Sequence, residues 1–474
     1  MLHCTKINPV DRASVPPVSS ISKPSFELPL APFRGCLTVL LLSGVAVLLA
    51  TGEPSSAWAQ TIGNTSAVGQ TPTSGAEAVG DTLPDDLRPD EPLQDRFDRR
   101  VTIPGTQVGA VSFQAQAVAD LGFNDNVFAQ DTGVKSDAFV DYGARVNADY
   151  HYDGLRADLS LSYLERHYLQ LGNEDYWQGG TRLQLSDQLS TDLGVFLDGG
   201  VQRLSVPRTD PNTINGFKPA TYLLYDAETG TTIGTGDHNL VTVTAGYNQT
   251  IYDQSFGAQG LIITNDRDRQ EIFGDVRFDH TFFGNQKVFV EVRPDGRSFG
   301  REFDASGYQR ASNGVRADTG FQLDIDSLFL VSLSGGYQTQ AYADPRYGTI
   351  DKPDVTAEVL WSPTQLTQLD VKYVHEYYED IFIESPGYVH DMTTVTLSHE
   401  LRRDILLKLD TSYDDRQLER SARHYDILTS EARVDYEVAR GITIGVDYTN
   451  QHLTSNTTRT FDDNIVMLSF KKQF

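Results

Sequence analysis

Apolar and polar residues alternate over unusually long runs, and this alternation most constrains what the chain can fold into. From residue 107 to residue 474 the period of two recurs, and no long helical period appears. In 138–150 the apolar positions are Val140, Tyr142, Ala144, Val146, Ala148 and Tyr150, and the polar ones are Asp141, Arg145, Asn147 and Asp149. Successive side chains of a strand point to opposite faces, so the pattern predicts strands with one apolar and one polar face.

The length of these runs separates the classes of β protein. Strands of soluble sandwiches average about 5–6 residues, whereas the alternating runs here are about 11–18 residues long, enough to cross a bilayer when tilted. A β-helix would need a short fixed repeat, and the sequence has none. Only a closed barrel satisfies every backbone group of strands in lipid. We therefore predict an all-β fold, a transmembrane antiparallel up-and-down β-barrel over residues 106–474.

The connections between the predicted strands alternate between tight and long, as expected for short periplasmic turns and longer external loops. A tight turn is expected at Asp253-Gln254, followed by a barrel strand over 254–266, and the longest loop is expected over 206–236. In that loop, Phe217, Asn212, Tyr222 and Tyr225 are candidates for a saccharide-binding surface or a constriction. About 18 strands are predicted, with 16 as the alternative.

The first 59 residues are predicted to be a signal peptide with an extended basic region. An apolar run of 15 residues at 36–50 follows Arg34 and is shorter than the roughly 20 residues of a transmembrane helix. The small residues Ala57 and Ala59 predict cleavage after Ala59, and a membrane anchor is the alternative. Residues 60–105, rich in Gly, Thr, Ser, Pro and Asp, are predicted to be a disordered periplasmic leader.

The end of the chain carries an alternating apolar set that finishes on an aromatic residue: Val466, Leu468, Phe470 and Phe474. This set resembles the signal by which outer-membrane assembly machinery recognises barrels, although Lys472 departs from the pattern. Together with the export signal it predicts a Gram-negative outer-membrane protein. The expected partners are lipid, lipopolysaccharide and the barrel-assembly machinery.

Four segments carry a family resemblance: GFNDNVFA (122–129), SNGVRADTGF (312–321), LWSPTQLTQLDVKY (360–373) and FDDNIVMLSF (461–470). They resemble the putative β-barrel porin 2 family, whose members are outer-membrane barrels often associated with exopolysaccharide or capsule production. The resemblance implies the fold and the location more firmly than a substrate, and it transfers no functional residue.

A barrel of 16–18 strands leaves an aqueous lumen. The predicted inward positions carry both signs of charge, and charged rings can select ions and polar solutes. The simpler alternative is wall charges that pair with each other, each pair contributing about 0–1 kcal/mol. The candidate pore-lining residues are Arg145, Arg156, Asp158, Arg182, Asp275, Arg277, Glu291, Arg293, Arg316, Asp318, Asp370, Lys372, Glu376, Glu431, Arg433 and Asp435.

The expected function is a porin-like conduit for small polar solutes or saccharides, linked to exopolysaccharide or capsule export or biosynthesis, with polysaccharide or export proteins as partners. The first alternative is a non-conducting accessory subunit of polysaccharide export. The second is an outer-membrane hydrolase, testable at His238 and His424. The sequence has no HExxH, GxSxG or P-loop motif, so no enzyme activity, cofactor or metal site is expected.

Two further classes are disfavoured by composition. The formal net charge is −26, and nucleic-acid binding needs clustered Lys and Arg to contact phosphates. Cys4 and Cys36 both precede the predicted cleavage site, so the mature chain has no cysteine for a disulfide framework.

Overall fold

The computed structural model describes residues 92–474, except 237, 284–285, 326–327, 383–384 and 457–458. The predicted signal peptide and most of the predicted leader lie outside the described residues. All the described residues belong to one compact unit, Val47–Phe474.

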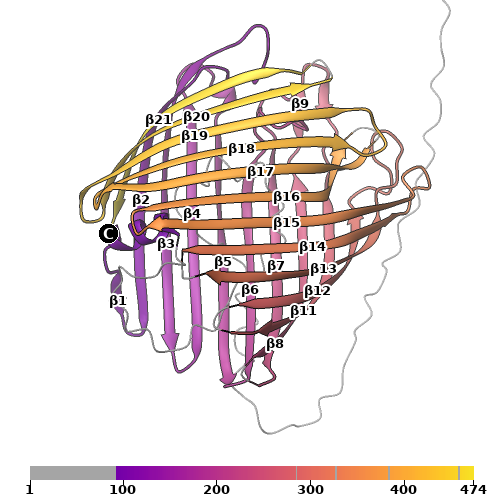
Figure 1. The fold of residues 1–474 in the computed structure, drawn as a ribbon. Helices are drawn as coiled ribbons and strands as arrows, with labels where there is room; N and C mark the ends of the chain where they lie inside the picture. The colour runs from indigo at the N-terminus through magenta and orange to yellow at the C-terminus, as the bar shows by residue number, and fades with distance from the viewer. Residues whose placement is uncertain (1–91, 237, 284–285, 326–327, 383–384, 457–458) are drawn as a thin grey trace, which may run out of the picture. The chain divides into compact units, whose positions relative to one another are not determined.

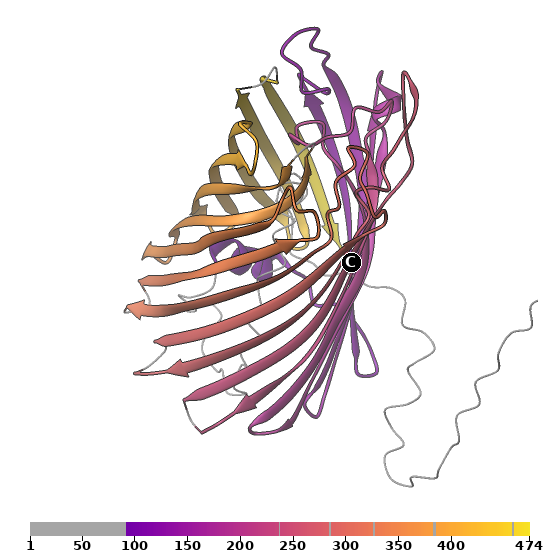
Figure 2. The same cartoon turned by 90° about the vertical axis from the view of Figure 1, so that its right-hand side faces the viewer.

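In the described part of the chain, eighteen antiparallel strands form a closed barrel (Figures 1 and 2). The barrel strands are β2 (Val111–Asn124), β3 (Asp137–Tyr152), β4 (Leu155–Tyr168), β5 (Tyr176–Ser190), β6 (Leu193–Ser205), β7 (Thr221–Gly234), β8 (Asn239–Tyr252), β11 (Arg269–Thr281), β12 (Lys287–Phe299), β13 (Ser312–Ile325), β14 (Phe329–Tyr342), β15 (Thr349–Thr364), β16 (Thr367–Phe382), β17 (Ser385–Arg402), β18 (Ile405–Leu418), β19 (His424–Ala439), β20 (Ile442–Ser455) and β21 (Phe461–Gln473).

Pairing of the first and last strands closes the cylinder. β2 pairs with β3 along one side and with β21 along the other, from Gln116 opposite Gln473 to Asn124 opposite Ile465. Every other barrel strand pairs with its neighbours in sequence, except that β8 pairs directly with β11. The closed ladder leaves no open edge, which is what a membrane-spanning sheet requires. The predicted barrel class and strand number are confirmed.

Two local predictions are wrong, and their errors cancel in the count. The expected 206–236 loop contains the barrel strand β7, so the loop is only 206–220. The expected strand 254–266 instead forms a small hairpin of β9 (Ser255–Gly257) and β10 (Gly260–Ile262), paired only with each other. The predicted tight turn at Asp253-Gln254 is therefore the start of a long connection. β7 was missed because its Thr and Gly residues hide the alternation, yet it is paired along its length to both β6 and β8.

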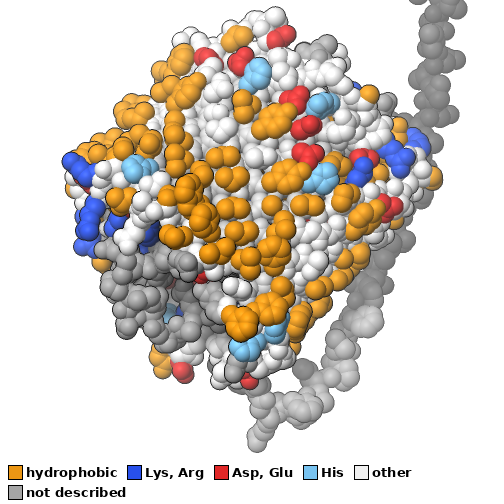
Figure 3. Space-filling model, viewed as in Figure 1, with side chains coloured by type: hydrophobic (Ala, Val, Ile, Leu, Met, Phe, Trp, Pro, Cys, Tyr) orange, Lys and Arg blue, Asp and Glu red, His pale blue; other side chains and the backbone are white. Residues whose placement is uncertain are grey.

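The outer face of the barrel is apolar. Large side chains on this face are exposed, including Leu121, Val276 and Val446. The residues directly before and after each of these three in sequence are buried or partly buried. Figure 3 shows hydrophobic side chains spread broadly over the face of the barrel in this view. The alternation predicted from sequence therefore separates a lipid-facing side from a polar inner side.

The last strand places its alternating set on the outer face. Val466, Leu468, Phe470 and Phe474 are exposed, so the predicted assembly signal lies on the outer face, with the exposed Lys472 between Phe470 and Phe474. Its recognition by the assembly machinery stays a prediction.

A short helix, α2 (Leu93–Val101), and the strand β1 (Thr106–Val108) precede the barrel. The prediction of a disordered leader over 60–105 is therefore wrong for the helical residues 93–101. Asp95 in the first turn of α2 and Arg99 and Arg100 in the last turn complement the helix dipole. One face of α2 is buried and consists of Leu93, Phe97 and Val101, which are spaced four residues apart. The polar residues around them made this apolar spacing hard to recognise in the sequence. Among the described residues, no helix is both long and apolar enough to cross a membrane.

Candidate functional site: the barrel lumen

The predicted pore-lining residues share the inner face of the wall. Along β19, Glu431, Arg433 and Asp435 are buried, while Val434 and Tyr436 between and beside them are exposed to the outside. The same alternation places all sixteen candidates on the face opposite the exposed apolar side chains: Arg145, Arg156, Asp158, Arg182, Asp275, Arg277, Glu291, Arg293, Arg316, Asp318, Asp370, Lys372, Glu376, Glu431, Arg433 and Asp435. Their role in solute passage stays a prediction.

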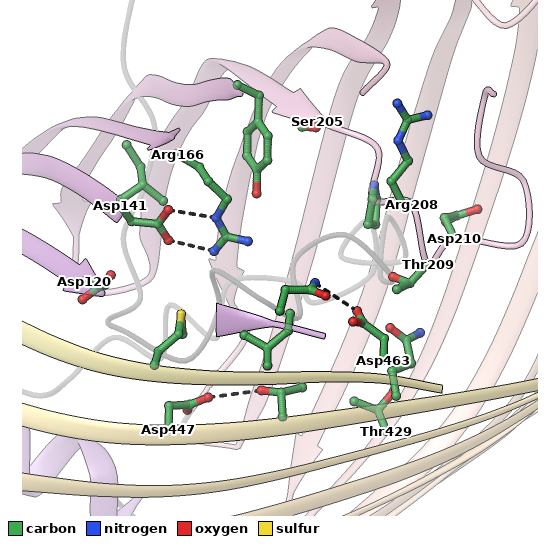
Figure 4. A pocket seen from close by; sticks show the side chains of 18 of the residues that line it. Asp120, Asp141, Arg166, Ser205, Arg208, Thr209, Asp210, Thr429, Asp447 and Asp463 are labelled. Carbon is green, nitrogen blue, oxygen red and sulfur yellow. Dashed lines mark hydrogen bonds and ion pairs between the residues drawn. The ribbon is translucent and has the colours of Figure 1, made fainter. Parts of the chain in front are cut away.

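One cavity of about 450 Å³ lies inside the barrel. Strands β2–β5 line one side of it, and strands β16–β21 line the other. Figure 4 shows Asp141 and Arg166 on one side and Asp447 and Asp463 on the other, with Arg208 and Asp210 contributed by the 206–220 loop. The cavity is therefore bounded by charged side chains from strands far apart in the sequence.

Many of these charges are paired along the wall. Arg166 of β4 makes two hydrogen bonds to the Asp141 carboxylate of β3, at 2.8 and 2.7 Å, and its guanidinium lies 3.8 Å from the Phe139 ring centroid. Two parallel N–H···O bonds hold a guanidinium in one orientation. This arrangement favours the simpler explanation for individual wall charges, that they pair with each other.

A longer network joins side chains of five strands in the wall between β13 and β18. Arg316 contacts the carboxylates of Asp354 at 3.1 Å and Glu376 at 3.3 Å. His390 lies between Glu376 at 3.2 Å and Asp414 at 3.3 Å. These contacts join the polar side chains of that wall into one connected layer, which fixes their positions relative to the lumen.

The 206–220 loop folds over the long-loop mouth of the barrel. Arg208 pairs with Glu174 at 2.8 Å and donates to the backbone carbonyls of Ile214 and Gly216 within its own loop, at 3.1 and 3.0 Å. Arg459, between β20 and β21, donates to the carbonyl of Asp210 at 2.6 Å and to that of Arg208. The loop thus reaches the β20–β21 connection, and its residues 206–211 line the cavity.

The aromatic surface expected in this loop does not form. Tyr222 and Tyr225 belong to β7, and Tyr222 is buried against Tyr252 with ring centroids 5.1 Å apart. Asn212 accepts hydrogen bonds from Arg267, and Phe217 is exposed. Residues 206–211 and Pro219 of the loop line the cavity, and a constriction by this loop stays a prediction.

Helix α2 lies in the opposite mouth, at the tight-turn end, which is periplasmic in bacterial outer-membrane barrels. Its Leu93 N–H donates to Gln368 Oε1 at 2.8 Å, and Arg100 pairs with Glu400 at 2.6 Å. Leu93, Phe97 and Val101 form a buried cluster with Leu406, on the inner face of β18. Burial raises the pKa of the Asp98 carboxyl above its usual value. The described leader residues therefore occupy part of the lumen.

Several residues of the cavity wall were not predicted from the sequence. Arg166, Arg208, Arg416 and Asp463 line the cavity but were not candidates. Arg416 follows Asp414 by two residues, as the candidate Arg277 follows Asp275, so this spacing could have found it. Arg208 lies in a loop without periodicity, and no local signal points to it.

The two histidines chosen to test a hydrolase lie far apart. His238 is in the tight turn between β7 and β8, whereas His424 begins β19 at the long-loop end. Strands of 14 residues separate these two ends at about 3.4 Å per residue. His238 and His424 therefore cannot contribute to one catalytic site.

Comparison with known proteins decides the family. The family model described as "Putative beta-barrel porin 2" matches residues 103–474. The chain belongs to this family. The porin 2 assignment agrees with the closed barrel and locates the protein in the outer membrane. No curated protein matches the chain significantly in sequence.

Solved outer-membrane proteins show a remote likeness. OpdK from Pseudomonas aeruginosa is 8% identical, with a TM-score of 0.42 over 77% of this chain and 99% of that one. OccK2 (OpdF) from the same organism is 10% identical, with a TM-score of 0.45 over 76% and 98%. OccAB4 from Acinetobacter baumannii is 10% identical, with a TM-score of 0.43 over 76% and 98%.

Proposed function

We propose that this porin 2 barrel is a narrow conduit for small polar solutes or saccharides across the outer membrane. The observation that carries the proposal is the charged cavity of about 450 Å³ inside a closed barrel, below the 206–220 loop. This volume lies within the roughly 300–1,000 Å³ of small-molecule pockets. It suits single small solutes and not an extended polymer.

The lining charges support a preference among solutes. Nine acidic and seven basic side chains line the cavity. An acidic excess lowers the electrostatic energy of cations and raises that of anions in a confined lumen. Small cations and neutral polar solutes are therefore the favoured class.

Single-channel recording in planar bilayers tests the conduit. We expect discrete conductance steps and, under a KCl gradient, a reversal potential displaced toward that of K⁺. A barrel that is folded by heat-modifiable gel mobility but yields no steps would overturn the proposal, and a displacement toward the Cl⁻ potential would overturn the solute preference.

A second candidate, a non-conducting accessory subunit, is favoured by one observation: α2 occupies the periplasmic mouth. The link to exopolysaccharide or capsule rests on the resemblance of the four sequence segments. Deletion of the gene would then abolish polymer display at the cell surface, while deletion of residues 60–104 would leave the barrel silent in bilayers. Normal polymer display in the deleted strain would exclude this role.

Export by a cleaved signal peptide belongs to the same proposal. The apolar run 36–50 and the small residues before Gln60 support it. N-terminal sequencing of the protein purified from outer membranes should begin at Gln60. A mature chain that retains residues 36–50 would show an anchor instead.

A further inference from the structure

Three side chains on the outer wall converge near the long-loop end of β18 and β19: Asp415, His424 and Asp426. We propose that they bind one divalent metal ion of the Zn²⁺ class. Their ligand atoms all lie within 4.8 Å of one another. His424 Nε2 is 2.9 Å from Asp415 Oδ1 and 3.4 Å from Asp426 Oδ1.

Strand register brings the three residues together. Asp415 lies directly opposite Asp426, and Gln417 lies opposite His424. His424 and Asp426, two residues apart, therefore share the outer face of β19 beside Asp415. Like charges directly opposite on one sheet face destabilise the pair. A bound cation would remove this repulsion.

The distances fit coordination. Zn–N bonds are about 2.0–2.1 Å and Zn–O bonds about 2.0–2.2 Å, so two ligands of one ion at angles of 90–110° lie about 3–3.5 Å apart. The two distances from His424 Nε2 match that spacing. This nitrogen is closed off from solvent and makes no hydrogen bond, although two carboxylate oxygens lie within reach.

The surrounding residues hold one ligand in place. The Tyr413 hydroxyl donates to Asp426 Oδ1 at 2.6 Å, and the Thr454 hydroxyl reaches Asp426 Oδ2 at 3.5 Å. Partners of this kind orient carboxylate ligands in metal sites. Three protein ligands leave a fourth position for water, as in open zinc sites.

Three other histidines of the outer wall do not bring two carboxylates to one ring nitrogen. His375 meets one carboxylate, Asp391, at 2.8 Å, and His452 meets Asp462 at 2.6 Å. His167 meets two carboxylates, but through different ring nitrogens. Among the described residues, the cluster at His424 is the single group of three with ligand atoms this close. His375 therefore serves as the matched control.

Metal titration of the tag-free barrel in detergent, stripped with a chelator, tests the site. We expect calorimetry with Zn²⁺ to show one ion per barrel, and Co²⁺ to give the visible absorption of a low-coordinate complex. His424→Gln and Asp415→Asn should weaken Zn²⁺ binding at least tenfold, while His375→Gln should bind as the unsubstituted protein does. Heat-modifiable gel mobility shows that each variant is folded.

Two results would overturn the proposal. One is an unsubstituted barrel that binds no Zn²⁺ or Co²⁺. The other is a folded His424→Gln variant that binds with unchanged stoichiometry and affinity, because the ion would then lie elsewhere.

Discussion

At the scale of single residues, the side chains that shape the lumen act by pairing with distant partners. Arg208 joins its loop to Glu174, and the two side chains are nearly buried, at 10% and 3% exposed. Removing one partner of a buried pair leaves the other charge uncompensated. We therefore expect the position of the 206–220 loop to depend on Arg208.

The consequence is testable with Arg208→Ala. We expect the free energy of unfolding to fall by about 3–5 kcal/mol and the single-channel conductance to rise as the loop loosens. Denaturant unfolding and bilayer recording measure the two effects. Arg402→Ala breaks the more exposed Arg402–Asp404 pair, at 62% and 31% exposed, and should cost only about 0–1 kcal/mol. Equal losses in the two variants would contradict the role of Arg208.

Asp98 makes the docking of α2 depend on pH. Burial raises the pKa of its carboxyl, so the docked helix binds the proton more tightly than the free helix does. This protonation therefore stabilises docking fully at pH values below the usual carboxyl pKa. The stabilisation is lost as the pH rises from that value through the raised pKa.

Limited proteolysis of α2 across that range measures the effect. Cleavage should slow as the pH falls, and Asp98→Asn should remove the dependence. Cleavage that quickens with acid in the unsubstituted chain would reverse the sign and contradict this account.

At the scale of elements, a short apolar stripe in a polar segment packs helix α2 against the barrel wall. Leu93, Phe97 and Val101 are at most 3% exposed and pack on Leu406. A nine-residue helix is marginal in isolation, so this contact holds it in the mouth. The stripe was visible in the sequence, but three apolar residues among charged ones do not predict docking without knowledge of the surface that receives them.

Phe97→Asp should release α2 from the barrel. Loss of a buried Phe costs about 3–5 kcal/mol, more than a short helix can lose and remain docked. If the barrel conducts, we expect a higher conductance and faster proteolysis of residues 93–101. Gln107→Ala, at an exposed position outside α2, should change neither. Unchanged proteolysis of the Phe97→Asp chain would show that other contacts hold the helix.

The two misassigned segments illustrate the limit of local patterns at this scale. β7 contains Thr229, Gly230, Thr231 and Thr232, which weaken the contrast between its faces, yet its backbone completes ladders on both sides. The segment 254–266 has local strand character but finds no place in the barrel, because β8 is already paired with β11. Pairing with neighbouring strands, and not the hydropathy pattern, therefore decided that β7 is a barrel strand and that the segment 254–266 is not.

At the scale of the whole molecule, the outward stripe of β21 concerns assembly. Deletion of Phe474, which is 56% exposed, removes little packing. We expect the folded protein in outer membranes to fall severalfold while refolding into detergent is unchanged, because a signal and not the fold is lost. Lys472→Ala is the control and should assemble normally. Equal loss of detergent refolding would show a structural role instead.

The sequence by itself determined the class of barrel and which face meets lipid, whereas the predicted number of strands agreed only because two local errors cancelled. The class and the lipid face follow from strand length and a period of two, which are local properties of most strands. Only the tertiary structure decided what lies inside. The contact of Leu93 with Gln368 spans 275 residues and that of Arg459 with Asp210 spans 249. Such contacts exist only after closure brings distant strands around one lumen, so no local pattern encodes them.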